Sequence, residues 1–415
     1  MSAQIRPAPA GYDVETYRRD FPILATTMHG KPLVYLDSGA SAQKPRQVMD
    51  AMRHLYEHEY ANIHRGVYWL SQRSTELYEE AREAVRALLG AASAREIVFT
   101  RNATEAINLV ASSYGGSFLE PGDEVIISAL EHHSNIVPWQ MLRDARGIVL
   151  KVAPIGDEGE FLLAPFKALL TPRTRLVAVA HMSNALGTML PVAEITRLAH
   201  GMGARVLLDG SQAAVHTPVD VQAIGCDFYV VTGHKLYGPS GIGALYARAP
   251  LLDEMPPYQG GGDMIASVTF EKSTWAPAPA KFEAGTPAIA QAVGLKAAID
   301  YMRAIGIERI AAHEHDLLAY CTQRLSAIPG LRIIGTAPGK GAVVSFVLDG
   351  VHPHDIGTIL DQQGVCVRAG HHCAQPVMER FDVPATVRAT FGLYNTRADV
   401  DALARAVEQV KDIFA

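Results

Sequence analysis

The chain has 415 residues, of which 48% are hydrophobic and 19% are charged, and its formal net charge is −6. This length allows two domains, or one large domain with a smaller one attached. The acidic balance, together with the absence of a basic run, argues against a protein that binds nucleic acids generally.

The sequence gives no sign of export or of membrane insertion. Residues 1–22 have no apolar core of the kind found in a signal peptide, and no apolar stretch reaches the ~18 residues that span a bilayer. The four cysteines, Cys226, Cys321, Cys366 and Cys373, lack the spacing of a disulfide framework. We therefore expect reduced thiols in a cytoplasmic protein that has no membrane or nucleic-acid partner.

Short apolar runs alternate with segments of helical periodicity in the first 249 residues, after a lead of about ten residues that we expect to be flexible. Strands are expected at 33–36, 96–100, 124–128, 148–154, 176–180, 206–209, 228–231 and 243–246. Helices are expected at 13–21, 45–60, 71–89, 103–113, 135–146, 165–170 and 192–202. The alternation predicts an α/β fold, with a mostly parallel sheet covered by helices on both faces.

The pattern changes after residue 249. Residues 258–279 are rich in glycine and proline and predict irregular structure. Helices are then expected at 289–305, 307–328, 354–363 and 398–414, and strands at 331–334, 342–347, 365–367 and 386–391. We predict three parts: a lead and short helix (1–22), a large domain (23–290) and a small α+β C-terminal domain (291–415).

Lys235 follows a buried strand directly and precedes a glycine-rich turn. Burial lowers the pKa of a lysine amine and makes it nucleophilic, so Lys235 could form a Schiff base with pyridoxal phosphate. Asp209 ends another apolar strand, where a carboxylate is costly unless it meets a cation such as a pyridinium nitrogen. The alternative for Lys235 alone is a lysine whose stem packs on the surface while its ammonium reaches water.

Other polar residues also follow strands of the large domain, where ligands bind in such sheets. Thr104 opens a helix, and could help to hold a phosphate or merely cap that helix. His132 and His133 follow the strand at 124–128, and either could stack on a flat ring or cap a helix. Asn184 follows a further strand. Together with Asp209 and Lys235, these positions indicate one ligand site.

The small domain adds a cysteine and an arginine. Cys373 precedes an expected helix and follows two histidines, which are typical surroundings of a nucleophilic thiol. It could instead be a small buried side chain or a zinc ligand, but no paired cysteine spacing supports zinc, and we predict no metal site. The other three cysteines are expected to be structural. Arg388 lies in a strand and needs an anion, either a substrate carboxylate or a side chain of the protein.

Several motifs resemble those of SufS-type cysteine desulfurases, the second group of the family that includes selenocysteine lyases. These motifs are Asn62-Ile-His-Arg-Gly66, Arg101-Asn-Ala-Thr-Glu-Ala-Ile-Asn108, Glu131-His-His-Ser-Asn-Ile-Val-Pro-Trp139, Leu208-Asp-Gly-Ser-Gln212, Thr232-Gly-His-Lys-Leu-Tyr-Gly-Pro239, Gly260-Gly-Gly-Asp-Met264, Phe282-Glu-Ala-Gly-Thr-Pro287 and Arg368-Ala-Gly-His-His-Cys373. The resemblance runs from about residue 13 to the end. It implies the class V aminotransferase fold, pyridoxal 5'-phosphate as cofactor, and a homodimer with active sites near its interface.

The resemblance also implies roles for single residues. Lys235 is expected to hold the cofactor, with Asp209 at its ring nitrogen and His132 stacked on its ring. Further cofactor contacts are expected from Thr104, Gln212, Thr232, His234 and, toward the neighbouring subunit, Thr286. Residues near the substrate are expected to be Arg388, which holds its carboxylate, and Asn184, His64 and Arg368. Cys373 matches the cysteine that takes the sulfur as a persulfide.

The expected reaction converts L-cysteine to L-alanine and supplies sulfur for iron–sulfur cluster assembly. Lys235 would move the Cα proton, and His132 is a candidate proton donor. The segment 368–373 is short, which suggests that an acceptor protein resembling SufE or SufU comes to the thiol. The alternatives are a selenocysteine lyase, another pyridoxal enzyme such as an aminotransferase, and a non-catalytic sulfur carrier or assembly scaffold. The combination of Lys235, Asp209 and Cys373 argues against the scaffold.

Overall fold

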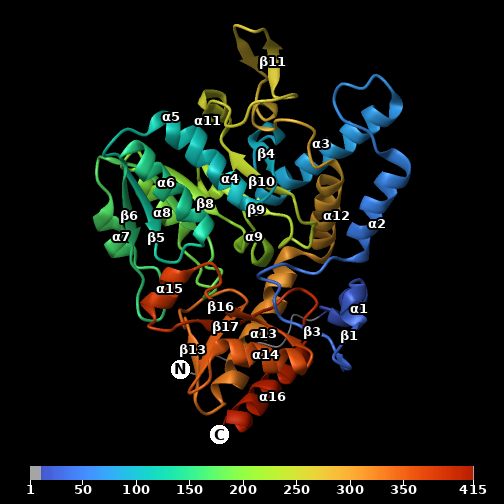
Figure 1. Cartoon of the computed structure of the whole chain (residues 1–415), viewed down its shortest axis with the longest axis vertical. Helices are drawn as coiled ribbons and strands as arrows, with labels where there is room; N and C mark the ends of the chain where they lie inside the picture. The colour runs from blue at the N-terminus through green and yellow to red at the C-terminus, as the bar shows by residue number, and fades with distance from the viewer. Residues whose placement is uncertain (1–10, 415) are drawn as a thin grey trace.

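A seven-stranded sheet forms the centre of the larger part of the molecule, the upper part in Figure 1. The computed structural model describes residues 11–414, and the predicted lead over the first ten residues lies outside this range. The strand order is β4-β10-β9-β8-β7-β5-β6. These strands are β4 (Ile97–Thr100), β5 (Glu124–Ser128), β6 (Val149–Ala153), β7 (Thr174–Ala180), β8 (Arg205–Asp209), β9 (Phe228–Thr232) and β10 (Gly243–Ala247). Only β10 runs antiparallel to its neighbours, which confirms the predicted mostly parallel sheet.

Helices cover both faces of this sheet because neighbouring strand residues point to opposite sides. In β8, Leu207 packs in one apolar core with α4 (Ala103–Leu109) and α6 (Val137–Arg146). Val206 and Leu208 pack in the other core with α3 (Trp69–Leu89), α8 (Val192–His200) and α12 (Ile289–Ile305). The remaining helices of this part are α2 (Arg46–His54), α5 (Gly116–Phe118), α7 (Leu163–Leu169), α9 (Ala213–His216), α10 (Val221–Ile224) and α11 (Ala249–Glu254).

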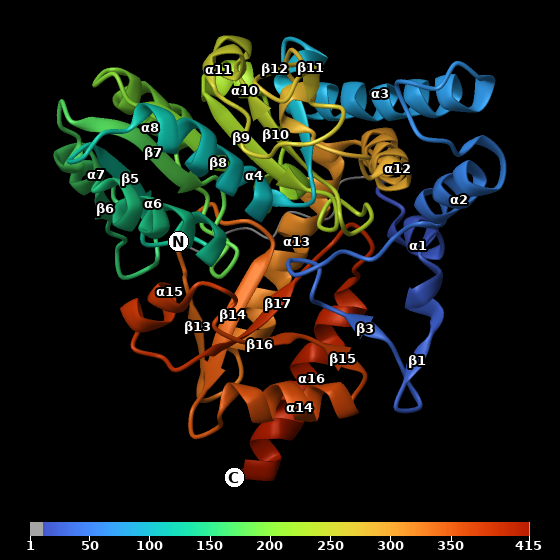
Figure 2. The same cartoon turned by 45° about the horizontal axis from the view of Figure 1, so that its top comes forward.

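The smaller part is an antiparallel sheet in the order β13-β14-β17-β16. Its strands are β13 (Leu331–Ile334), β14 (Val343–Leu348), β16 (Arg368–Gly370) and β17 (Thr386–Thr390). The accompanying helices are α13 (Ile307–Ser326), α14 (Pro353–Gln362), α15 (Gln375–Arg380) and α16 (Arg397–Phe414). This part lies below the larger sheet in Figure 2. The cavity described below is lined by residues of both parts.

The N-terminal segment joins the smaller part. Strand β3 (Val34–Tyr35) pairs in parallel with β15 (Val365–Cys366). Figures 1 and 2 show α1 (Val14–Arg19) and the hairpin of β1 (Thr27–Met28) and β2 (Lys31–Pro32) on the same side of the molecule. The pairing comes from residues about 330 apart, which local sequence patterns do not reveal. The predicted boundary at residue 23 therefore remains a prediction.

The glycine- and proline-rich region contains a hairpin that the sequence patterns did not indicate. Strands β11 (Ile265–Val268) and β12 (Ser273–Trp275) pair with each other and project from the top of the molecule in Figure 1. The prediction of irregular structure was wrong for these residues. Most of them are exposed on both faces, so they lack the apolar alternation by which a half-buried strand is recognised.

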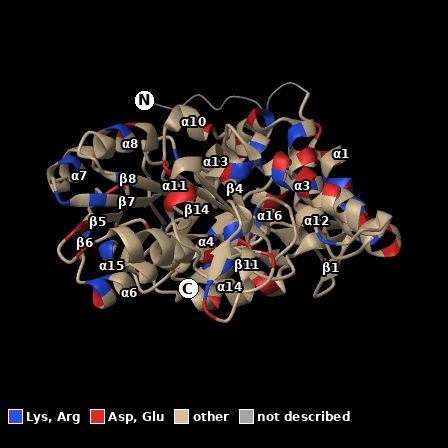
Figure 3. Ribbon diagram, turned by 90° about the horizontal axis from the view of Figure 1, so that it is seen from above, with Lys and Arg blue, Asp and Glu red and all other residues tan. Residues whose placement is uncertain are grey.

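Acidic and basic residues are interspersed over the helices when the molecule is seen from above (Figure 3). Among the helices of residues 11–414, none combines the length and the apolar character needed to cross a bilayer.

A buried ion pair joins α3 to β4 and to the loop before α12. Arg82 is 3% exposed, and its Nη1 lies 2.6 Å from Oε1 of Glu283. The same arginine donates to the carbonyl of Ile97, and Glu283 accepts from the backbone N–H of Phe99 at 2.6 Å. Three segments that are distant in sequence thus meet at one charge pair.

Replacing Glu283 by alanine is expected to destabilise the protein by about 3–5 kcal/mol, because the Arg82 charge would stay buried without its buried partner. The shift of the urea unfolding midpoint, followed by circular dichroism, measures this. Glu79→Ala is the matched control, since Glu79 pairs with the same arginine but is 47% exposed. Its expected effect is about 0–1 kcal/mol, and equal shifts for the two variants would contradict the argument.

Candidate active site

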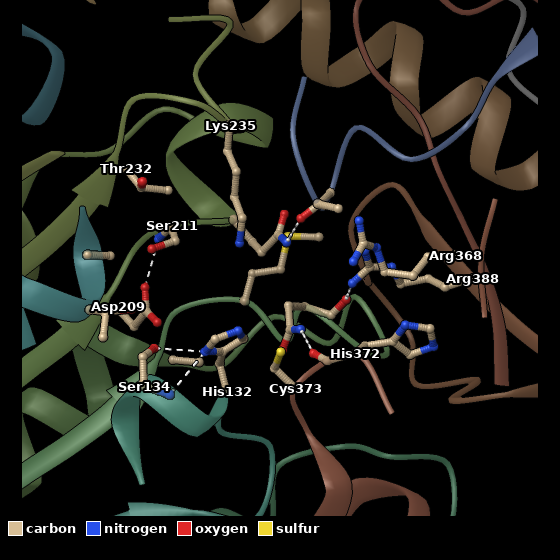
Figure 4. A pocket seen from close by; sticks show the side chains of 18 of the residues that line it. His132, Ser134, Asp209, Ser211, Thr232, Lys235, Arg368, His372, Cys373 and Arg388 are labelled. Carbon is tan, nitrogen blue, oxygen red and sulfur yellow. Dashed lines mark hydrogen bonds between the residues drawn. The ribbon is translucent and has the colours of Figure 1, made fainter. Parts of the chain in front are cut away.

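A cavity of about 350 Å³ lies at the carboxyl ends of the larger sheet, facing the smaller part (Figure 4). The structure brings eleven of the residues expected from the sequence to its wall. They are Thr104, His132, Asn184, Asp209, Gln212, Thr232, His234, Lys235, Arg368, Cys373 and Arg388. Side chains from both parts of the molecule therefore share one space.

Two expected residues lie elsewhere in the chain. His64 is exposed beside α3, with Nε2 3.7 Å from Oε1 of Glu79. Thr286 lines a second cavity of about 460 Å³, together with Tyr258 and Glu283. Neither residue lines the first cavity, so their expected roles stay predictions.

Lys235 reaches the cavity from a tight turn after β9. The turn is closed by a hydrogen bond from the Gly233 N–H to the Ile242 carbonyl at 2.9 Å, and a Cβ on Gly233 would lie 2.7 Å from Cγ2 of Ile242. Shielding from water lowers the pKa of Lys235 to about 8, while the carboxylate of Asp209 acts in the opposite direction. A substantial share of the amine is thus neutral and nucleophilic near physiological pH.

Asp209 ends β8 with only 7% of its surface exposed. Its Oδ1 accepts from the Ser211 N–H at 3.0 Å, which fixes the carboxylate (Figure 4). The next residue is a glycine because a Cβ there would overlap the ring of Tyr229. The strand end therefore presents a rigid carboxylate to the cavity.

His132 is neutral and held in one orientation. Its Nδ1 accepts from the Ser134 N–H at 3.1 Å, which leaves the ring proton on Nε2. Burial and the nearby Lys235 lower the pKa of His132 to about 4, and Asp209 opposes this. Behind it, Glu131 is fully buried, accepts from the Ala180 N–H at 2.9 Å, and has its pKa raised to about 7 by burial.

Two arginines of the smaller part converge on one carboxylate that the sequence patterns did not single out. Nη2 of Arg388 lies 3.3 Å and Nη2 of Arg368 lies 2.9 Å from oxygens of Asp37. Arg388 is 2% exposed and also donates to the carbonyl of Asn184 at 2.8 Å. Two anions were considered for Arg388, a substrate carboxylate and a side chain of the protein. The second is present, as the carboxylate of Asp37. Asp37 follows β3, and its position depends on the pairing of β3 with β15.

Five buried polar atoms of residues on the cavity wall have no hydrogen-bond partner in the described part of the chain. They are Oγ of Ser211, Oγ1 of Thr232, Oδ1 of Asn184, Nδ1 of His372 and Nε of Arg388. Such atoms are costly unless a ligand or water satisfies them. Hydroxyl and guanidinium donors suit anionic groups, and the Lys235 amine suits an aldehyde. Pyridoxal phosphate combines an aldehyde with an anion, so the residues present fit it.

Gln212 makes a contact that bears on its expected role. Its amide donates to the carbonyl of Gly39 at 2.8 Å, so a contact of the same amide with a cofactor oxygen remains a prediction.

Cys373 is the exposed member of the four cysteines, all of which are free thiols. Burial raises the pKa of Cys226 and of Cys321 to about 12, and it also raises the pKa of Cys366, which is partly buried. Those three thiols are held in the unreactive protonated form. Cys373 is therefore the thiol that both lines the cavity and is open to solvent.

Comparisons with known proteins agree on one family. Residues 34–403 match the family model described as aminotransferase class V. A probable cysteine desulfurase of Mycolicibacterium paratuberculosis is 53% identical over 409 residues, which are 99% of this chain and 60% of the relative. A cysteine desulfurase of Dickeya dadantii is 51% identical over 96% of this chain and 97% of the relative. The crystal structure of the Escherichia coli cysteine desulfurase CsdA matches with a TM-score of 0.91 and 39% identity, over 97% of this chain and 100% of that one. The chain thus spans less than two thirds of the length of the Mycolicibacterium relative.

In the cofactor-free protein, Asp209→Asn is expected to lower the pKa of Lys235 below about 8, because the carboxylate of Asp209 raises it. The neutral amine is the reactive form, so acetylation of Lys235 rises with pH through its pKa and should begin at lower pH in the variant. Peptide mass spectrometry after acetylation at a series of pH values measures this. Lys340, whose pKa is also lowered to about 8 by burial, serves as the internal control and should not move. An unchanged or higher midpoint for Lys235 would contradict the argument.

Proposed function

Since the chain belongs to the aminotransferase class V family, we propose that it is a pyridoxal-phosphate-dependent cysteine desulfurase of the SufS type. It converts L-cysteine to L-alanine and keeps the sulfur as a persulfide on Cys373. The observation that carries this proposal is the shared cavity, in which the solvent-accessible thiol of Cys373 and the desolvated amine of Lys235 face one space.

The cofactor is pyridoxal 5'-phosphate, which supplies an electron sink for bond cleavage next to the amino group when bound. Lys235 would hold its aldehyde carbon, Asp209 would face its ring nitrogen, and His132 would lie on the ring. The remaining contacts would come from Thr104, Thr232 and His234 to the phosphate, and from Gln212 to the ring oxygen. The unpaired hydroxyl of Thr232 supports the phosphate position.

The substrate carboxylate would bind Arg388, whose buried Nε is free to donate, with Asn184 and Arg368 beside it. The neutral form of Lys235 takes the Cα proton of the substrate. The Cys373 thiolate attacks the substrate sulfur, so that an S–S bond forms while the Cβ–S bond breaks. The electron pair of the broken bond stays on the carbon side and takes up a proton, for which Nε2–H of His132 is the candidate donor. Lys235 then returns the Cα proton, so the products are the Cys373 persulfide and L-alanine.

We also propose the partners that this chemistry requires. A second copy of the chain would bring Thr286 and His64 to the site, since neither lines the cavity of its own chain. The persulfide sulfur would pass to an acceptor protein resembling SufE or SufU, and from there to iron–sulfur clusters. Four unpaired thiols are consistent with a reducing compartment, and we propose the cytoplasm.

Alanine release from L-cysteine by the purified, cofactor-loaded protein tests the function. We expect alanine to accumulate only when a thiol reductant is present, because the persulfide blocks further turnover until its sulfur is removed. Release that needs an added keto acid would instead indicate an aminotransferase. Release from selenocysteine but not from cysteine would indicate a selenocysteine lyase.

Replacing Cys373 by alanine is expected to abolish persulfide formation while the visible absorption of the cofactor is retained, because the thiol does not hold the cofactor. Cys366→Ala is the matched control and should form the persulfide normally, since Cys366 is partly buried and outside the cavity wall. Persulfide labelling followed by peptide mass spectrometry reads both variants. Label on Cys366 in the Cys373→Ala protein would mean that the proposal names the wrong thiol.

A further inference from the structure

Two adjacent histidines of the larger part, His132 and His133, contact different parts of the site. His132 lines the cavity, whereas the next ring, His133, lies beside the loop of residues 371–374, here called the Cys373 loop. The two rings are tilted by 47° with their centroids 6.3 Å apart. One short turn after β5 therefore touches both the cofactor position and the loop that carries the thiol.

His133 makes two hydrogen bonds that flank the thiol. Its backbone N–H donates to the carbonyl of Cys373 at 2.7 Å. Its ring Nε2 accepts from the backbone N–H of Gln375 at 3.1 Å. Since Nε2 accepts this hydrogen bond, it carries the lone pair and the ring proton lies on Nδ1. Residues on either side of Ala374 are thus tied to a single residue of the larger part.

The backbone of the Cys373 loop needs such ties. His372 and Cys373 both have φ of +54°, in the left-handed region that side chains with a Cβ rarely adopt. Histidine adopts this region more often than most residues, but cysteine does not, so local preference does not account for the conformation of Cys373. Outside His133, the loop is held by Asn184, whose Nδ2 donates to the His372 carbonyl at 2.6 Å. The His372 ring itself lies 2.7 Å from Oγ1 of Thr386.

We propose that His133 is a positioning residue that holds the Cys373 loop in its left-handed conformation and so keeps the thiol over the cavity. The role of that thiol in sulfur transfer rests on the proposed function, but the positioning does not. The ring of His133 touches neither the cavity nor the thiol itself, so it acts through the backbone at Gln375. Because His132 is its neighbour in sequence, the same turn sets the distance between the cofactor position and the sulfur.

The test compares three variants of the cofactor-loaded enzyme. His133→Leu removes the ring acceptor, His133→Gln keeps an acceptor oxygen at similar reach, and Gln375→Ala removes a neighbouring side chain but keeps the backbone N–H. The readouts are the rate of Cys373 alkylation by iodoacetamide, measured by peptide mass spectrometry, the cofactor absorption, and kcat and KM for L-cysteine.

With the ring acceptor gone, the loop relaxes away from the cavity. For His133→Leu we expect alkylation of Cys373 to become at least about threefold faster, and kcat to fall by about tenfold or more with KM nearly unchanged, because a small misplacement of a reacting group is costly. The cofactor absorption should stay as in the wild type. His133→Gln and Gln375→Ala should both resemble the wild type. If His133→Leu does not fold, His133→Asn, whose amide is too short to reach Gln375, takes its place.

Wild-type alkylation and kcat in the variant without the ring acceptor would overturn the proposal. So would an equal effect of Gln375→Ala, or a failure of glutamine to restore the wild-type values. Alkylation requires no turnover. A wild-type protein that forms no alanine would therefore contradict the desulfurase function, while the alkylation rates would still decide the role of His133.

Discussion

Removal of the Lys235 amine from water is the constraint around which the cavity is arranged. Desolvation favours the neutral amine, and the nearby carboxylate of Asp209 limits that effect, so the pKa settles at about 8. The same shielding keeps His132 neutral, with a pKa of about 4. Within residues 11–414, the site also leaves the Ser211 and Thr232 hydroxyls without hydrogen-bond partners. A ligand that satisfies these groups would stabilise the folded protein as well as complete the site.

The cavity exists only because two parts of the chain meet, and Asn184 shows how they are joined. Its backbone carbonyl accepts from Arg388, while its side-chain amide donates to the carbonyl of His372. Asn184 thus contacts both the arginine that could bind a substrate carboxylate and the loop that carries the thiol. On the side of the smaller part, Asp37 pairs with both Arg368 and Arg388, and it follows a strand that is itself paired there. A relative movement of the two parts would disturb substrate binding and thiol position together.

Much of this arrangement is encoded in local patterns. Buried strands that end in polar residues predicted the sheet and brought Asp209 and Lys235 to one edge, because the chemistry of a parallel sheet gathers at its carboxyl ends. Asp37 and Ser211 were missed, because only the tertiary structure shows why they matter. Asp37 meets two arginines that are distant in sequence, and the buried Ser211 hydroxyl has no hydrogen-bond partner among the described residues. The hairpin of β11 and β12 escaped detection because both of its faces are largely exposed. His64 and Thr286 were named from a resemblance, and a single chain does not bring them to the site.

Burial also decides which of four chemically identical thiols can react. In the apolar interior a thiolate is unfavourable, which raises the pKa of Cys226 and Cys321 to about 12 and leaves them as small packing groups. Cys366 lies partly buried next to the sulfur of Met28, and its pKa is raised as well. Cys373 is exposed, because its loop lies at the open edge of the cavity in a left-handed backbone conformation with contacts to the larger part. Exposure thus distinguishes Cys373 from the other three thiols, and the contacts of its loop hold it on the wall of the cavity that Lys235 also lines.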